Sequence, residues 1–136
     1  MTQASVLIVD DEPFARQTLL EWLRRKNFRV IEADGGRRAM ERIRKDEPDI
    51  IVSNMVMPGM DGLQLLEESK TVRADVPFLM ITGYPSHSAA VKAIKYGAAD
   101  YLAKPVTPEE LMRRVNRVLL QKSASRPFAQ KKPRLL

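Results

Sequence analysis

The chain has 136 residues, a length typical of one domain with a single hydrophobic core. Hydrophobic residues make up 44% and charged residues 29%, and no apolar run approaches the ~20 residues that a membrane-spanning helix needs. The N-terminus lacks the pattern of a signal peptide, and the absence of cysteine excludes disulfides and thiolate metal sites. We therefore expect a cytoplasmic protein that makes no membrane contact.

The formal net charge of +6 is unevenly distributed along the chain. Residues 122–136 hold five basic and no acidic residues, which leaves 18 basic against 17 acidic residues over 1–121. We predict a folded domain over 1–121 and a basic, linker-like or disordered tail over 122–136. Since the excess charge belongs to the tail, it does not indicate that the folded part binds nucleic acid. Such tails often join domains, so we expect the chain to be cut from a longer protein, in which a C-terminal effector domain of any kind, or none, could follow.

Five apolar segments are predicted to form strands, and each is followed by signals for a helix. The segments rich in β-forming residues are 6–9, 28–32, 49–53, 76–81 and 100–103. Helix starts are indicated by Pro13 after three acids, by Gly35-Gly36, by Asp61, by Ser86 or Ser88, and by Thr107. This alternation predicts an α/β fold in which a single, doubly wound, five-stranded parallel sheet has helices on both faces.

The strand ends carry the residues best suited to chemistry. Because the carboxyl ends of parallel strands meet at one edge, we expect that edge to hold Asp10, Asp11, Asn54, Thr82 and Lys104. Adjacent carboxylates suit Mg²⁺, and a hydroxyl and a lysine opposite them suit an oxyanion. A carboxylate at the third strand end would complete the cation site and could attack a phosphoryl group, but residue 54 is an amide. Alternatively, the two aspartates only favour the N-terminus of a helix.

Five motifs, in order, resemble those of the receiver domain of bacterial response regulators, which act in two-component signalling. They occupy residues 6–12, 57–62, 81–83, 97–101 and 102–105, and the resemblance covers about residues 5–121. It implies a flavodoxin-like receiver fold with strand order 2-1-3-4-5. It also implies a sensor histidine kinase or phosphotransfer protein as partner.

The resemblance assigns roles to the residues at the sheet edge. Asp11 would bind Mg²⁺ directly, Asp10 would act largely through water, and the main-chain carbonyl of Val56 would supply a further ligand. Thr82 and Lys104 would contact the phosphoryl group.

The resemblance further implies a conformational switch and a signalling surface. Tyr101 would change rotamer together with Thr82, although Tyr101 could instead be an ordinary packed aromatic. The Lys104-Pro105 bond would be cis. The face formed by residues 86–121 would be the signalling surface and could form a homodimer.

Asn54 departs from the family pattern, because it stands where the family has its phosphoacceptor aspartate. An amide is a poor nucleophile and cannot form an aspartyl phosphate. Its carbonyl oxygen can still bind a cation, but the loss of one negative charge should weaken Mg²⁺ binding. We expect no enzymatic activity, since the family catalyses only its own phosphoryl transfer and dephosphorylation, and Asn54 disables both.

Two origins of Asn54 are open. It is either an engineered Asp-to-Asn substitution in a two-component receiver, or the natural residue of a pseudo-receiver that signals through binding alone. The retained Asp10, Asp11, Thr82 and Lys104 favour the first origin. Deamidation of Asn54 is a minor third route to a functional site. An enzyme related to small α/β hydrolases or phosphatases is a distant alternative, since it needs an acidic nucleophile.

Overall fold

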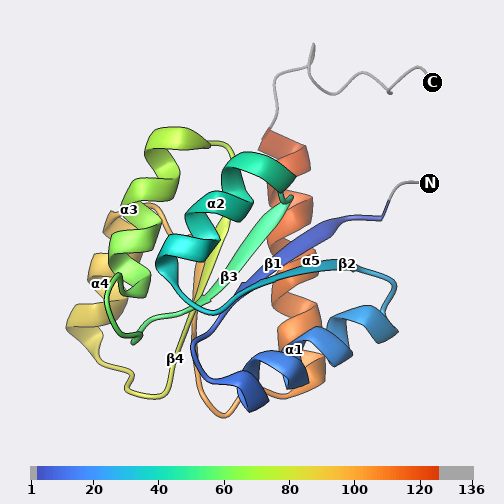
Figure 1. Ribbon diagram of the computed structural model, residues 1–136, viewed down its shortest axis with the longest axis horizontal. Helices are drawn as coiled ribbons and strands as arrows, with labels where there is room; N and C mark the ends of the chain where they lie inside the picture. Colours follow the sequence, from blue (N-terminus) through green and yellow to red (C-terminus); the bar gives the residue numbers. More distant parts are fainter. Residues whose placement is uncertain (1–2, 126–136) are drawn as a thin grey trace.

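Five parallel strands form one sheet in the order β2-β1-β3-β4-β5, as predicted (Figure 1). The structure is a computed structural model and describes residues 3–125. The strands are β1 (Ser5–Val9), β2 (Arg29–Ala33), β3 (Ile50–Asn54), β4 (Phe78–Thr82) and β5 (Asp100–Ala103). The bounds of β5 are those predicted, and the other strands differ from prediction by one or two residues at one or both ends. One of these differences matters, because β3 includes Asn54 as its last residue.

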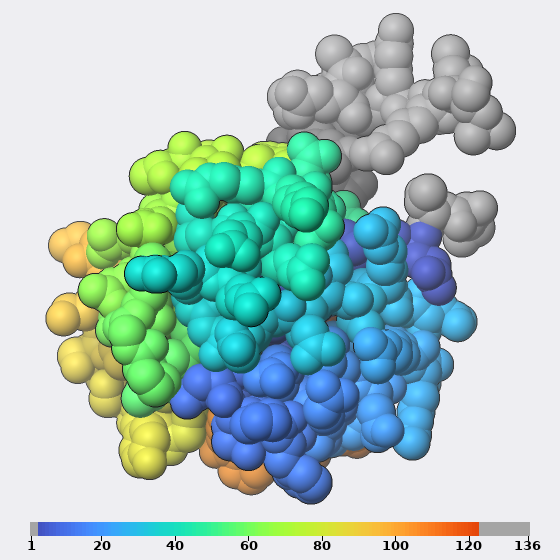
Figure 2. Space-filling view, in the orientation of Figure 1, coloured from blue at the N-terminus to red at the C-terminus, as the bar shows by residue number. Residues whose placement is uncertain are grey.

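Helices cover both faces of the sheet. They are α1 (Pro13–Arg25), α2 (Gly36–Asp46), α3 (Gly62–Val72), α4 (His87–Lys95) and α5 (Pro108–Ser125). Side chains of α1 and α5 pack on one face, and those of α2, α3 and α4 pack on the other. In the space-filling view, α2 and α3 cover the second face (Figure 2). The chain therefore changes face between α1 and α2 and again between α4 and α5, which leaves helices on both faces as in a doubly wound fold.

Local capping determines where several helices begin. Asp61 accepts a hydrogen bond from the main-chain N–H of Gln64, whose side chain accepts one from the N–H of Asp61, so the two residues form a capping box. Ser86, rather than Ser88, caps α4, and the hydroxyl of Thr107 accepts from the N–H of Glu110 at the start of α5. These caps confirm the predicted helix starts.

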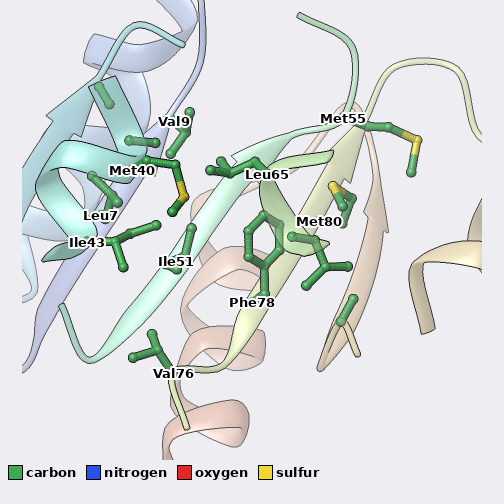
Figure 3. Close-up of a cluster of buried hydrophobic side chains, with 14 of the residues drawn as sticks. Leu7, Val9, Met40, Ile43, Ile51, Met55, Leu65, Val76, Phe78 and Met80 are labelled. Atoms are coloured by element: carbon green, nitrogen blue, oxygen red, sulfur yellow. The ribbon is translucent and has the colours of Figure 1, made fainter. Parts of the chain in front are cut away.

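The central strands β1, β3 and β4 are buried on both faces because their alternate side chains enter two separate cores. The core under α2, α3 and α4 includes Leu7, Val9, Met40, Ile43, Ile51, Leu65, Phe78 and Met80 (Figure 3). The core under α1 and α5 includes Val6, Ile8, Leu20, Leu23, Val52, Leu79, Leu111, Val115 and Val118. Both cores depend on continuous apolar strands, which is the pattern that predicted this fold.

Helix α5 runs further than expected. It ends at Ser125, so the predicted boundary between residues 121 and 122 lies inside the helix. The rest of the predicted tail, 126–136, lies outside the described residues. Within the described part of the chain, no helix has the length and apolar character that crossing a membrane requires.

Candidate functional site

Strand register brings the predicted site residues to one edge of the sheet. Val9, the last residue of β1, pairs with Ser53, and Asn54 at the end of β3 pairs with Ile81. Thr82 at the end of β4 pairs with Ala103, the last residue of β5. The residues at or just after these ends, Asp10, Asn54, Thr82 and Lys104, therefore follow one another along the carboxyl edge.

Asp10 is a buried carboxylate beside a lysine. Its side chain is 2% exposed, and its Oδ1 accepts a hydrogen bond of 3.0 Å from the N–H of Glu12. The Nζ of Lys104 lies 3.8 Å from its Oδ2. Burial raises the pKa of Asp10, the Glu12 N–H and the Lys104 charge oppose that rise, and the charges of Asp11 and Glu12 add to it. Lys104 thus partly compensates a buried negative charge.

Thr82 and Lys104 are joined through the backbone. The N–H of Lys104 donates to the carbonyl of Thr82 at 2.8 Å, and the Lys104-Pro105 bond is cis, as expected. Thr82 is fully buried, and its hydroxyl accepts from the N–H of Tyr84 at 3.0 Å. The two groups expected to contact a phosphoryl group are therefore held on neighbouring strand ends.

Asn54 and Val56 contact each other directly. The Nδ2 of Asn54 donates a hydrogen bond of 2.9 Å to the main-chain carbonyl of Val56. Both groups were expected to offer oxygen ligands to a cation, but here one is a donor aimed at the other. Across residues 3–125, no group of three acidic, histidine or cysteine side chains is placed to hold a metal ion. As they stand, the Asn54 amide nitrogen and the Val56 carbonyl do not fit Mg²⁺, which requires an oxygen lone pair from each of its ligands.

The loop between β3 and α3 is fixed at both ends. The N–H of Met55 donates to the carbonyl of Ile81 at 2.8 Å, and the N–H of Gly62 donates to the carbonyl of Met55 at 2.7 Å. A Cβ added to Gly62 would lie only 2.6 Å from the carbonyl oxygen of Asn54. Met55 and Met57 are buried, whereas the side chain of Val56 between them is exposed. These contacts fix both ends of the loop that carries the Val56 carbonyl.

Tyr101 lies on β5, with its ring against the core under α2, α3 and α4. Its hydroxyl is buried and has no hydrogen-bond partner among the described residues. Burying a hydroxyl group without a hydrogen-bond partner costs folding free energy. A phenylalanine packed in the same place would not have this cost. The ring therefore packs as the simpler interpretation expects, but its hydroxyl group is not satisfied in this rotamer.

Sequence reasoning missed an apolar groove next to the site. The groove has a volume of about 500 Å³ and runs between α1 and the loop after β5, with Asp10 and Lys104 among its lining residues. Most of its walls are apolar, and Phe14 at its rim is 80% exposed. Phe14 is a large apolar residue on α1, whose buried residues are Leu20 and Leu23, and a phenylalanine one residue after the helix start was the available signal. Arg16, whose Nη1 donates to the carbonyl of Asp10 at 2.8 Å, was also missed.

Comparison with known sequences identifies the family. A model of the response regulator receiver domain matches residues 6–116. The chain is 38% identical over 117 residues to the C4-dicarboxylate transport transcriptional regulatory protein DctD of Pseudomonas aeruginosa, covering 86% of this chain and 25% of DctD. It is 32% identical to the chemotaxis protein CheY of Bacillus subtilis, covering 84% of this chain and 96% of CheY. The first curated relatives are longer proteins, of which this chain spans between a quarter and a half.

Solved structures show the same fold. The CheY-like receiver domain protein from Methanospirillum hungatei superposes with a TM-score of 0.88 at 25% identity, over 92% of this chain and all of that chain. A putative response regulator from Chloroflexus aurantiacus gives a TM-score of 0.83 at 34% identity, over 88% of this chain and 99% of that chain. The family match, the relatives and the strand order agree, and this chain belongs to the response regulator receiver domains of two-component signalling.

Proposed function

We propose that this chain is a receiver domain held in its unphosphorylated form. The observation that carries the proposal is Asn54, which ends β3 at the edge where Asp10, Thr82 and Lys104 also lie. An amide nitrogen is not nucleophilic, because its lone pair is delocalised, and the amide oxygen carries no formal charge. The chain then accepts no phosphoryl group, is not an enzyme, and signals only through the conformation it already has.

We further propose that Asn54 replaces an aspartate, by engineering, in a receiver that is otherwise able to accept phosphate. The buried Asp10 beside Lys104 supports this origin, since burying a carboxylate is costly and a chain with no phosphoryl chemistry gains nothing from it. Thr82, buried with its hydroxyl at the strand end, supports it as well. The codon for residue 54 in the source gene distinguishes this origin from the natural one.

The alternative is a natural pseudo-receiver that binds a partner without phosphorylation. The observation in its favour is an exposed apolar surface on α4, where Val91 and Ile94 are 50% and 54% exposed. Exposed apolar side chains that lie close together are typical of interaction sites. Under either proposal, the surface formed by residues 86–121 is where we place the downstream partner or a second copy of the chain.

We propose that an upstream sensor histidine kinase or phosphotransfer protein docks over the groove between α1 and the loop after β5. The groove is apolar and is bordered by Asp10 and Lys104, so a protein bound there reaches the site.

DctD is described as a transcriptional regulatory protein, and this chain matches a quarter of it. We accordingly propose that the full-length protein carries a C-terminal effector domain.

The proposed function is tested by mass spectrometry of the intact protein after incubation with acetyl phosphate and Mg²⁺. We expect the chain as it stands to gain no phosphoryl group and the Asn54→Asp variant to gain one. Asn116→Asp is the matched control, because it makes the same chemical change at an exposed position on α5. A folded Asn54→Asp variant that gains no phosphoryl group would contradict the proposal, and so would phosphorylation of the unaltered chain.

A further inference from the structure

The hydrogen bond between Asn54 and Val56 lies where the family resemblance implies a divalent cation. Of the four groups expected to surround that cation, the Asn54 amide and the Val56 carbonyl are bonded to each other at 2.9 Å. A third, Asp10, has Oδ1 bonded to the Glu12 N–H and Oδ2 near Lys104, and the fourth, Asp11, is exposed. A cation that used the Val56 oxygen would first have to displace an N–H donor.

We infer that in this chain the Asn54 amide takes the place of the divalent cation and closes the Val56 carbonyl to metal. The inference rests on the proposed function, because it takes Asn54 to occupy the phosphoacceptor position. Compared with an aspartate at position 54, the asparagine does more than lack a negative charge and a nucleophile. Its N–H group supplies the positive end of a dipole to the same oxygen that a cation would otherwise bind.

The surrounding loop keeps this hydrogen bond in place. Main-chain hydrogen bonds join Met55 to Ile81 and Gly62 to Met55, and the burial of Met55 and Met57 fixes the direction of the peptide groups between them. The residues on either side of the Val56 carbonyl are thus held in place, which favours its hydrogen bond to Asn54. The amide is also suited to its role, because its nitrogen, unlike its oxygen, can donate a hydrogen bond to a carbonyl oxygen.

Two causes of weak Mg²⁺ binding can be separated by one substitution. If only the missing negative charge matters, Asn54→Ala binds Mg²⁺ no better than the unaltered chain, because both side chains are neutral. If the amide blocks the Val56 oxygen, Asn54→Ala binds Mg²⁺ more tightly, because it removes the blocking donor at unchanged charge. The Asn54→Asp variant restores the charge as well as freeing the carbonyl.

The test is a calorimetric titration of the three proteins with MgCl₂ alone, without a phosphodonor. We expect the tightest binding by Asn54→Asp, intermediate binding by Asn54→Ala, and the weakest by the unaltered chain. The gain from Asn to Ala should be roughly fivefold, the equivalent of one net hydrogen bond. Equal affinities of Asn54→Ala and the unaltered chain, including no binding by either, would overturn the inference, as would tighter binding by the unaltered chain.

A second measurement does not require the alanine variant to fold. In ¹⁵N-labelled unaltered chain, we expect one side-chain N–H of Asn54 to exchange slowly with water. The main-chain amide signals of residues 56 and 57 should stay unshifted at Mg²⁺ concentrations that saturate Asn54→Asp. Shifts of those signals in the unaltered chain, or fast exchange of both side-chain protons, would overturn the inference. Because no phosphoryl transfer is measured, these results leave the proposed function standing.

Discussion

Tyr101 has a ring suited to the core and a hydroxyl group without a partner. Since its hydroxyl is buried and makes no hydrogen bond within the described part of the chain, removing the oxygen should relieve a desolvation cost. We predict that Tyr101→Phe raises the free energy of unfolding by about 1–2 kcal/mol, measured by urea denaturation. Tyr96→Phe is the control, because Tyr96 is exposed and its change should stay within about 0.5 kcal/mol. A loss of stability in Tyr101→Phe would mean that the hydroxyl has a partner.

Asp100 joins β5 to α5 through two arginines. Its carboxylate accepts hydrogen bonds of 2.7–2.8 Å from Arg114 and of 2.7 Å from Arg117. Burial alone would raise the pKa of Asp100, but the bonds from Arg114, the Tyr101 N–H and Arg117 outweigh it and lower that pKa. A carboxylate whose pKa is lowered by folding stabilises the fold above its unfolded pKa. That stability disappears as the pH falls through the folded pKa.

We therefore predict that Asp100→Asn lowers the free energy of unfolding by about 1–2 kcal/mol at neutral pH. The difference from the unaltered chain should shrink as the pH falls below the unfolded pKa and vanish below the lowered folded pKa of Asp100, because both side chains are then neutral. Urea denaturation at several pH values measures this. A difference that stays constant with pH would show that shape, rather than charge, makes residue 100 important.

At the scale of single elements, the connection between β3 and α3 is tightly constrained at Gly62. A Cβ at Gly62 would lie 2.6 Å from the Asn54 carbonyl oxygen and 2.8 Å from the Met55 Cα, and these backbone atoms have little room to move. We predict that Gly62→Ala lowers the free energy of unfolding by about 2–3 kcal/mol. In Gly83→Ala the added Cβ meets only the Lys104 side chain, at 3.9 Å, so that control should change little. Equal effects of the two substitutions on thermal unfolding would contradict this account.

Much of each element could be predicted from the sequence, because strands and helices leave local patterns. The continuous apolar run of β1 and the polar caps Asp61 and Thr107 lie within the elements they indicate or directly beside them. The end of α5 could not be predicted, since residues 122–125 are compatible with either a helix or a tail.

Contacts within the site were less predictable than the elements. Motif positions placed Asp10, Thr82 and Lys104 at neighbouring strand ends, because parallel register follows from the fold. The Asn54–Val56 hydrogen bond and the unpaired Tyr101 hydroxyl depend on side-chain rotamers and on loop dihedrals, which no local pattern encodes. The roles of these residues in phosphoryl transfer stay predictions.

For the molecule as a whole, the exposed apolar side chains of α4 predict self-association. Ile94 is 54% exposed on the face proposed for signalling. We predict a concentration-dependent dimer in sedimentation velocity experiments, and we expect Ile94→Asp to weaken it because a charge would be buried at the interface. Phe14→Asp is the matched control, since Phe14 is also exposed and apolar but lies at the groove. A monomer at all concentrations would refute the dimer, and dissociation by Phe14→Asp would place it at the groove.

Helix α5 spans the molecule from the site to the opposite edge of the sheet. It begins shortly after Lys104, and near its far end the Nζ of Lys122 lies 3.5 Å from the carbonyl of Asp49, the residue before β3. Its 18 residues make a rod of about 27 Å. Such a rod works as a lever arm: if α5 tilts by roughly 5° about its end near Lys104, its other end moves by about 2 Å. A small displacement beside Lys104 would thus be converted into a larger one at the edge farthest from the site.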